Sequence, residues 1–219
     1  MFTGIIEEIG KVAKIQRTAN SYVLAIESKK ILQDIHLGDS IAVNGVCLTV
    51  TSFSGEQFTV DVMPETVKAT SLNNVQSGTK VNLERAMAAG GRFGGHFVSG
   101  HADGTGVIKR KQALENAIYY EIEADPEVLR YVIVRGSIAV DGTSLTVFDV
   151  SDSSFILSLI PHTLSETVIG LKGPGDIVNL ECDMIGKYVS HFIQNLGNES
   201  HQKKKLGITQ SFLEENGFY

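Results

Sequence analysis

Short runs in which apolar and polar side chains alternate follow one another through most of the chain. Residues 10–16, 22–27 and 117–124 are clear examples, and such alternation is typical of a β-strand with one buried face. In the first half we expect strands at 2–6, 10–16, 22–27, 40–43, 47–53, 57–63 and 80–84, with a helical turn within 29–35. About six short strands separated by turns predict a small closed β-barrel.

The central part of this pattern occurs twice. The segment Ser40–Val50 returns as Ser137–Val147, shifted by 97 positions, and the match continues without a gap to Met87 and Met184. An Asn44-Gly45 turn in the first copy and an Asp141-Gly142 turn in the second are typical of tight hairpins. The repeat therefore predicts two tandem domains of the same fold, 1–96 and 97–184, joined by a linker of small residues at 88–95.

After Met184 the pattern changes to that of a helix. The apolar residues Ile185, Tyr188, Val189, Phe192, Ile193 and Leu196 recur at helical spacing. Neither repeat has a counterpart to this stripe, which needs a cover: its own barrel, or the same helix from other copies of the chain. The lysines at 203–205 predict a solvated helix end. Residues 209–217 predict a further short helix that begins at Thr209 and ends at Gly217.

Composition excludes several classes of protein. A formal net charge of −6 argues against a nucleic-acid-binding surface. No apolar run is long enough to span a membrane, and the first residues lack the pattern of a signal peptide. The two cysteines occupy different positions in their repeats, so nothing pairs them, and a reducing cytoplasm is the expected location.

The candidate functional residues lie at positions where the two repeats differ although the residues around them match. Cys47 occupies the position in the first repeat that Ser144 occupies in the second. We interpret Cys47 either as a small buried core residue or as one edge of a ligand site. His101 stands where the first repeat has Ile5, next to Gly100, so it reads as an ordinary histidine or as a group close to a ligand. We predict that Asp183 caps the N-terminus of the C-terminal helix, belongs to the site, or does both.

Two other patterns contain residues that can bind a metal or a ligand. His96 and His101 do not form a zinc site, because no further His or Cys cluster completes one. The motifs Pro64-Glu65-Thr66 and Pro161-His162-Thr163 end equivalent strands; they are ordinary turns, or they leave backbone groups that can hydrogen-bond the edge of a heterocycle.

Several motifs together resemble one enzyme family. These are Met1-Phe2-Thr3-Gly4-Ile5, Asn44-Gly45-Val46-Cys47-Leu48-Thr49-Val50, Met63-Pro64-Glu65-Thr66, Gly94-Gly95-His96-Phe97-Val98-Ser99-Gly100-His101, Asp141-Gly142-Thr143-Ser144-Leu145-Thr146 and Ile160-Pro161-His162-Thr163. In order and spacing they resemble riboflavin synthases of the α-chain type, over about residues 1–205.

The resemblance implies an all-β fold of two six-stranded Greek-key barrels, followed by a trimerisation helix at 185–205 and a tail at 206–219. It implies a dismutation of two molecules of 6,7-dimethyl-8-ribityllumazine by four-carbon transfer. The products are riboflavin, a flavin, and 5-amino-6-ribitylaminopyrimidinedione. It also implies a homotrimer whose active site lies between the first barrel of one chain and the second barrel of a neighbour, and it implies neither cofactor nor metal. A lumazine synthase shell stays open as a further partner.

The same resemblance transfers site residues by motif. The candidate catalytic residues are Cys47, His101, Ser144 and Asp183. The first pocket would use Gly4, Ile5, Ile6, Cys47, Leu48, Thr49, Asp61, Val62, Met63, Pro64, Glu65 and Thr66. The second would use Gly100, His101, Ala102, Ser144, Leu145, Thr146, Leu159, Ile160, Pro161, His162, Thr163 and Leu164. Arg135, where the family usually carries lysine, would reach the neighbouring site.

Two other functions compete with this enzyme. One is a non-catalytic lumazine or flavin carrier built on the same barrels, against which the presence of Cys47, His101, Ser144 and the C-terminal helix argues. The other is an unrelated pair of barrels that binds a small molecule or an oligosaccharide, or a purely structural trimer.

Overall fold

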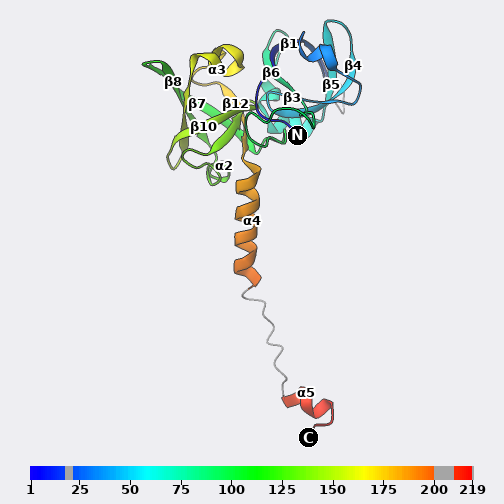
Figure 1. The fold of residues 1–219 in the computed structure, drawn as a ribbon, viewed down its shortest axis with the longest axis vertical. Helices are drawn as coiled ribbons and strands as arrows, with labels where there is room; N and C mark the ends of the chain where they lie inside the picture. The colour runs from blue at the N-terminus through cyan, green and yellow to red at the C-terminus, as the bar shows by residue number, and fades with distance from the viewer. Residues whose placement is uncertain (18–21, 200–209, 219) are drawn as a thin grey trace. The chain divides into compact units, whose positions relative to one another are not determined.

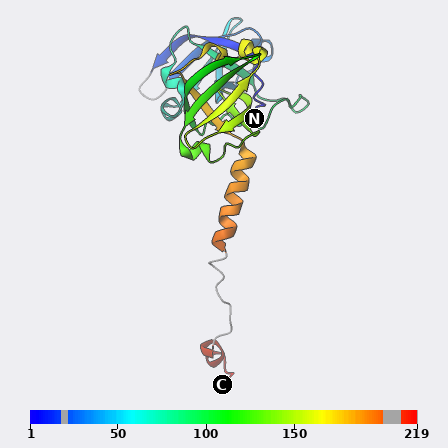
Figure 2. The ribbon, with the colours of Figure 1, turned by 90° about the vertical axis from the view of Figure 1, so that its left-hand side faces the viewer.

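A computed structural model describes residues 1–17, 22–199 and 210–218 of the chain. The chain divides into two compact units, Met1–Met184 and Ile185–Tyr219, each described by itself below. The first unit contains two β-barrels, which lie side by side in Figure 1; in Figure 2 the second barrel is in front of the first.

The first barrel closes from six antiparallel strands in the order β1-β2-β5-β4-β3-β6. Its strands are β1 (Glu8–Arg17), β2 (Tyr22–Glu27), β3 (Ser40–Val43), β4 (Val46–Phe53), β5 (Gln57–Val62) and β6 (Lys80–Arg85). Between them lie η1 (Ile31–Asp34), α1 (Pro64–Ala69) and η2 (Ser71–Asn74). β6 returns to pair with both β3 and β1, which closes the predicted Greek key.

The second barrel repeats this order, with the strands arranged β10-β11-β8-β7-β12-β9. Its elements are β7 (Gly104–Leu114), β8 (Ala117–Ala124), α2 (Pro126–Leu129), β9 (Ser137–Val140), β10 (Thr143–Val150), β11 (Ser154–Leu159), α3 (Pro161–Glu166), η3 (Val168–Leu171) and β12 (Ile177–Cys182). The predicted fold of two six-stranded barrels is therefore confirmed.

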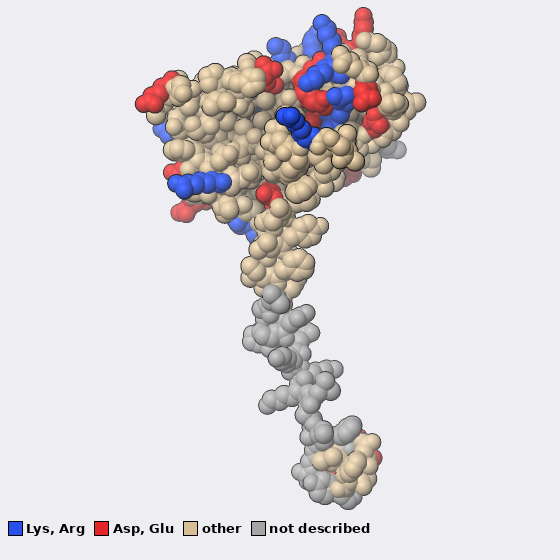
Figure 3. All heavy atoms as spheres, in the orientation of Figure 1, with Lys and Arg blue, Asp and Glu red and all other residues tan. Residues whose placement is uncertain are grey.

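Each barrel has its own core, because alternate side chains of every strand point inward. Phe58 and Phe155 hold equivalent central positions and are both fully buried. Neither cysteine forms a disulfide. In the view of Figure 3, Lys and Arg side chains gather together with Asp and Glu over the first barrel, whereas the visible face of the second barrel carries few charges.

The two tight turns bring the barrels into contact. Asn44-Gly45 and Asp141-Gly142 each have two successive residues with positive φ, between +44° and +79°, as a tight hairpin requires. A Cβ on Gly45 would lie 2.6 Å from the backbone nitrogen of Gly142, and a Cβ on Gly142 would lie 2.7 Å from that of Gly45. The turns touch backbone to backbone, which explains glycine at both positions.

Two buried asparagines extend this contact. The Asn82 side-chain amide donates to the carbonyl of Asp141 at 2.9 Å, and that of Asn179 donates to the carbonyl of Asn44 at 2.8 Å. Each asparagine belongs to one barrel and donates a hydrogen bond to a carbonyl in the tight turn of the other barrel. These two asparagines and the two glycine turns together form the seam between the barrels.

Some local expectations were wrong. No strand forms at 2–6; Phe2 instead makes an isolated bridge to Val98. The turns expected at Pro64 and Pro161 are the first residues of the helices α1 and α3, because proline at the first helical position leaves no amide hydrogen unsatisfied. The expected cap at Thr209 and the lysines at 203–205 lie outside the described residues.

The predicted C-terminal helix forms as α4 (Met184–Glu199), which lies in the second unit except for its first residue, and α5 (Gln210–Glu215) follows. Ile185, Tyr188, Val189, Phe192 and Ile193 of α4 are all more than half exposed. Beyond α5, Gly217 has a φ of +80°, and the Phe218 N–H donates to the Leu213 carbonyl at 3.0 Å, so glycine ends this helix as predicted. None of the helices in the described residues has the length and apolar character of a membrane span.

The seam can be tested with Asn82→Ala. This change leaves the Asp141 carbonyl without its side-chain donor and the Val168 N–H without its acceptor. We expect the free energy of unfolding in urea to fall by about 2–4 kcal/mol, because each buried group left unsatisfied costs about 1–3 kcal/mol. Exposed Asn74→Ala is the control, with an expected change within about 0.5 kcal/mol. Equal effects of both variants would contradict the seam.

Candidate functional site

The segment that precedes each barrel crosses to the other barrel. The Gly4 carbonyl accepts a hydrogen bond from the Ser144 N–H at 2.7 Å, and the Gly100 carbonyl accepts one from the Cys47 N–H at 2.8 Å. Gly4 and Gly100 have φ values of +76° and +84°. A Cβ on either would lie within 2.6 Å of the Cβ of Ser144 or Cys47 respectively. Both the conformation and the space therefore require glycine.

This crossing corrects the predicted grouping of site residues. Gly4–Ile6 were expected beside Cys47–Thr49, and Gly100–Ala102 beside Ser144–Thr146. The structure exchanges the two segments. The reason is the bridge between Phe2 and Val98, whose backbones exchange hydrogen bonds of 2.7 and 3.2 Å and carry each segment past its own barrel.

In the first barrel, the predicted residues divide between the two faces of the strands. Thr49, Asp61 and Met63 are exposed, and Cys47 is half-buried on the same outward-facing set of positions. Glu65 is also exposed, in the first turn of α1 beside half-buried Pro64 and Thr66. The outer surface of β4 and β5 thus presents a thiol, a hydroxyl and a carboxylate together.

The second barrel presents the equivalent face with different groups. Ser144 is half-buried, and Thr146 and Ile160 are exposed. His162 is exposed in the first turn of α3, next to exposed Pro161 and to half-buried Thr163 and Leu164. Four predicted residues point into the barrel cores instead and can offer a ligand only their backbones: Leu48, Val62, Leu145 and Leu159.

His96, which the sequence analysis did not place in a site, lies next to the predicted site residue Ser144. Its Nδ1 lies 2.7 Å from the Ser144 Oγ, its residue is 8% exposed, and its buried Nε2 has no hydrogen-bond partner among the described residues. Burial lowers the pKa of His96, against the opposing charges of Asp183 and Glu181. A neutral imidazole next to a hydroxyl is the arrangement that activates a serine.

The structure explains why two glycines precede His96. Gly95 precedes it, and a Cβ on Gly95 would lie 2.1 Å from the Thr3 carbonyl oxygen and 3.0 Å from the Ser144 Cβ. The histidine therefore sits in a segment that packs tightly against the second barrel. The partner of His96 is a hydroxyl 48 residues further along the chain, and no pattern near His96 in the sequence indicates it.

The first barrel has a different pair of functional groups. Cys47 lies directly under the Gly100 segment, and the following residue, His101, is exposed. The His101 N–H donates to the Ser99 Oγ at 3.3 Å, so its backbone is held while its imidazole is open to a ligand. Ala102 follows it, half-buried.

Two further predicted residues, Asp183 and Arg135, lie at the edges of the second barrel. Asp183 immediately precedes α4, and its charge acts on His96. Arg135 is exposed in the turn before β9, with a φ of +66° and its N–H donating to the Val147 carbonyl at 2.8 Å.

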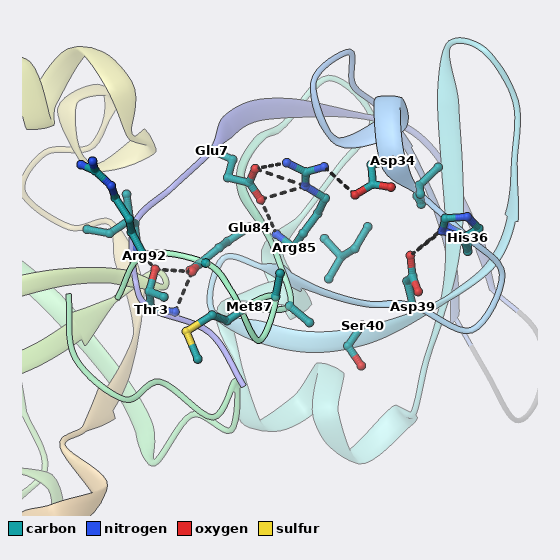
Figure 4. A pocket seen from close by; sticks show the side chains of 16 residues that line it. Thr3, Glu7, Asp34, His36, Asp39, Ser40, Glu84, Arg85, Met87 and Arg92 are labelled. Carbon is teal, nitrogen blue, oxygen red and sulfur yellow. Dashed lines mark hydrogen bonds and ion pairs between the residues drawn. The ribbon is translucent and has the colours of Figure 1, made fainter. Parts of the chain in front are cut away.

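A pocket of about 510 Å³ opens beside the crossing segment of the first barrel (Figure 4). Thr3, Ile5, Ser40, Glu84 and Arg85 are among the residues that line it. In this pocket Arg85 donates hydrogen bonds to the Glu7 carboxylate. Burial alone would raise the pKa of Glu7, but these hydrogen bonds and the positive charge of Arg85 lower it below its ordinary value. Cys47 and Ser144 do not line this pocket, but Ile5, which follows Gly4 in the crossing segment, does.

Comparison with known proteins gives a consistent picture. Residues 3–86 and 99–183 match the family model of the Lumazine binding domain. The riboflavin synthase of Bacillus subtilis (strain 168) is 57% identical over 218 residues, which cover 100% of both chains. That of Actinobacillus pleuropneumoniae is 54% identical over the same coverage. The crystal structure of LumP complexed with riboflavin is similar in fold, with a TM-score of 0.76 at 26% identity over 83% of this chain and 99% of that chain.

The state of His96 can be measured directly. Because burial disfavours the imidazolium, we expect a pKa below 6.5 in an NMR titration of the imidazole nitrogens, with His96→Gln used to assign the signal. Ser144→Ala should leave the pKa low, since burial is the main cause. A pKa at or above 6.5 would contradict a neutral imidazole beside Ser144.

Proposed function

The chain belongs to the riboflavin synthase family, and we propose that each of its two barrels binds one molecule of 6,7-dimethyl-8-ribityllumazine. It is a transferase of riboflavin biosynthesis. One lumazine donates a four-carbon unit to the other, which yields riboflavin and 5-amino-6-ribitylaminopyrimidinedione. The similarity to riboflavin synthases over the whole length carries this function.

The duplication suits a reaction between two copies of one substrate. We place one lumazine on the outer face of β4 and β5, with Cys47, Thr49 and the Gly100–His101 segment. The other lies on the outer face of β10 and β11, with Ser144 and the Gly4–Ile5 segment. No side chain of the described residues caps the N-terminus of α1 or α3, so the backbone amides of these first turns are proposed to bind the acceptors of the heterocycle.

The chemistry needs a nucleophile for one lumazine and a base for the acidic 7-methyl group of the other. Ser144 is the proposed nucleophile, because His96 Nδ1 lies 2.7 Å from its hydroxyl and can take its proton. The negative charge of Asp183 favours the imidazolium that results. His101 is the proposed base at the other pocket, beside Cys47.

The two pockets of one reaction are proposed to come from two chains of a homotrimer. The support is the exposed apolar stripe of α4, which needs a cover. Arg135 lies in an exposed turn with Ile133 and Val134, which are 67% and 50% exposed, and it would extend to the neighbouring site. Bringing the two lumazines face to face would supply much of the rate acceleration. A cytoplasmic location and association with a lumazine synthase shell complete the proposal.

The activity can be followed by absorbance with 6,7-dimethyl-8-ribityllumazine, without cofactor and with EDTA present. We expect one riboflavin for every two lumazines consumed. Ser144→Ala should lower kcat by roughly 100-fold or more, as expected for loss of a catalytic nucleophile with its base. Exposed Ser165→Ala, in α3, is the matched control and should keep wild-type activity. Tight binding of lumazine without turnover would support a carrier instead.

The role of the C-terminal helix can be tested by truncation. Deleting residues 185–219 should give monomers in sedimentation with little activity, because the stripe of α4 and the neighbour's pocket are lost together. Deleting only 206–219 is the control and should leave the oligomer intact. A fully active monomer after the longer deletion would overturn the trimer.

A further inference from the structure

A buried carboxylate in the first barrel holds the segment that crosses to the second. Glu84 Oε1 accepts hydrogen bonds from the Thr3 N–H at 2.6 Å and the Thr3 hydroxyl at 2.7 Å (Figure 4). Its Oε2 accepts from the Gly4 N–H at 3.0 Å. Glu84 lies on β6 and is 2% exposed. The same Gly4 gives its carbonyl to Ser144 of the other barrel.

The second barrel repeats this arrangement with the roles reversed. Glu181 on β12 accepts from the Ser99 N–H at 2.6 Å, the Ser99 hydroxyl at 2.7 Å and the Gly100 N–H at 3.0 Å. It is 4% exposed. Gly100 in turn gives its carbonyl to Cys47 of the first barrel.

The chemistry of both carboxylates makes these contacts strong. No ion pair among the described residues includes Glu84 or Glu181, so the charge of each is balanced by three donors from a single segment. A buried carboxylate that loses such donors is left without compensation, and each segment is therefore held firmly. Burial raises the pKa of Glu84 in spite of these donors.

We propose that Glu84 and Glu181 are positioning residues, each of which shapes the ligand pocket of the barrel opposite to its own. Glu84, in the first barrel, sets the Gly4–Ile5 edge of the Ser144 pocket. Glu181, in the second barrel, sets the Gly100–His101 edge of the Cys47 pocket. Neither carboxylate is placed in contact with substrate. The pockets are those of the proposed function, on which this assignment rests.

A thiol reporter tests the crossing without catalysis. Cys47 is half-buried under Gly100, whereas Cys182 is 1% exposed, so alkylation of substrate-free protein, mapped by mass spectrometry, reports on the Gly100 segment. Glu181→Gln keeps the shape but replaces an acceptor by a donor. We expect Cys47 to be alkylated roughly tenfold faster in this variant, consistent with a lost hydrogen bond to a charged group. Glu84→Gln is the matched control and should leave the rate near wild type.

The reciprocal measurement uses a chain with Cys47→Ser and Ser144→Cys. In this chain Glu84→Gln should accelerate alkylation at position 144, and Glu181→Gln should not. Ser99→Ala and Thr3→Val remove one hydroxyl each and give smaller changes of the same pattern, should a Gln variant fail to fold.

Kinetics adds a second readout. With lumazine as substrate, each Gln variant should raise KM more than it lowers kcat, because the edge of a pocket is disturbed and the reacting groups remain. The proposal would be overturned if alkylation became faster at the thiol in the same barrel as the mutated glutamate. It would also be overturned if each Gln variant accelerated alkylation equally at positions 47 and 144. A chain that lacks synthase activity but shows the crossed alkylation pattern would refute the proposed function and leave the positioning role intact.

Discussion

The structure depends on the exchange of two short segments between the barrels. Each segment starts from the Phe2–Val98 bridge, is bound by a glutamate of one barrel, and ends with a glycine carbonyl on the other. Neither barrel can therefore complete its outer face alone. The buried seam of asparagines and glycine turns keeps the barrels in the one arrangement in which both crossings can form.

Duplication gives two similar faces, and a few substitutions make them chemically unequal. One face has a thiol with an exposed histidine nearby, and the other has a hydroxyl paired with a buried histidine. A dismutation needs this combination, since the two substrates are identical but must play opposite roles. The shared frame supplies equivalent binding, and the differing residues supply different acid–base chemistry.

Much of the fold follows from local patterns in the sequence. Strand β2 and strand β8 have the predicted bounds, and the Asn44-Gly45 turn forms as expected, because alternation and turn residues act over a few positions. The wrong predictions concern contacts between residues that are far apart in the sequence. The repeat shows that Gly4 and Gly100 are equivalent, but equivalence does not say which barrel each one contacts.

The site was predictable to the same degree. The motifs pointed to Cys47, Ser144 and His101, and the structure places each of them at or beside an outer face. Leu48, Val62, Leu145 and Leu159 belong to the cores, as the period of two along a strand requires. His96 was missed because its partner, Ser144, is 48 residues away in the chain, and only folding brings a linker histidine next to a strand hydroxyl.

 The exchange is tested most directly by amide hydrogen exchange at Ser144 and Cys47 in two alanine variants. Gly4→Ala places a side chain against Ser144, and Gly100→Ala places one against Cys47. The account predicts that Gly4→Ala speeds exchange of the Ser144 amide and spares the Cys47 amide, whereas Gly100→Ala does the reverse. Loss of protection at Cys47 in Gly4→Ala, with Ser144 still protected, would show that each segment packs on its own barrel and would contradict the account.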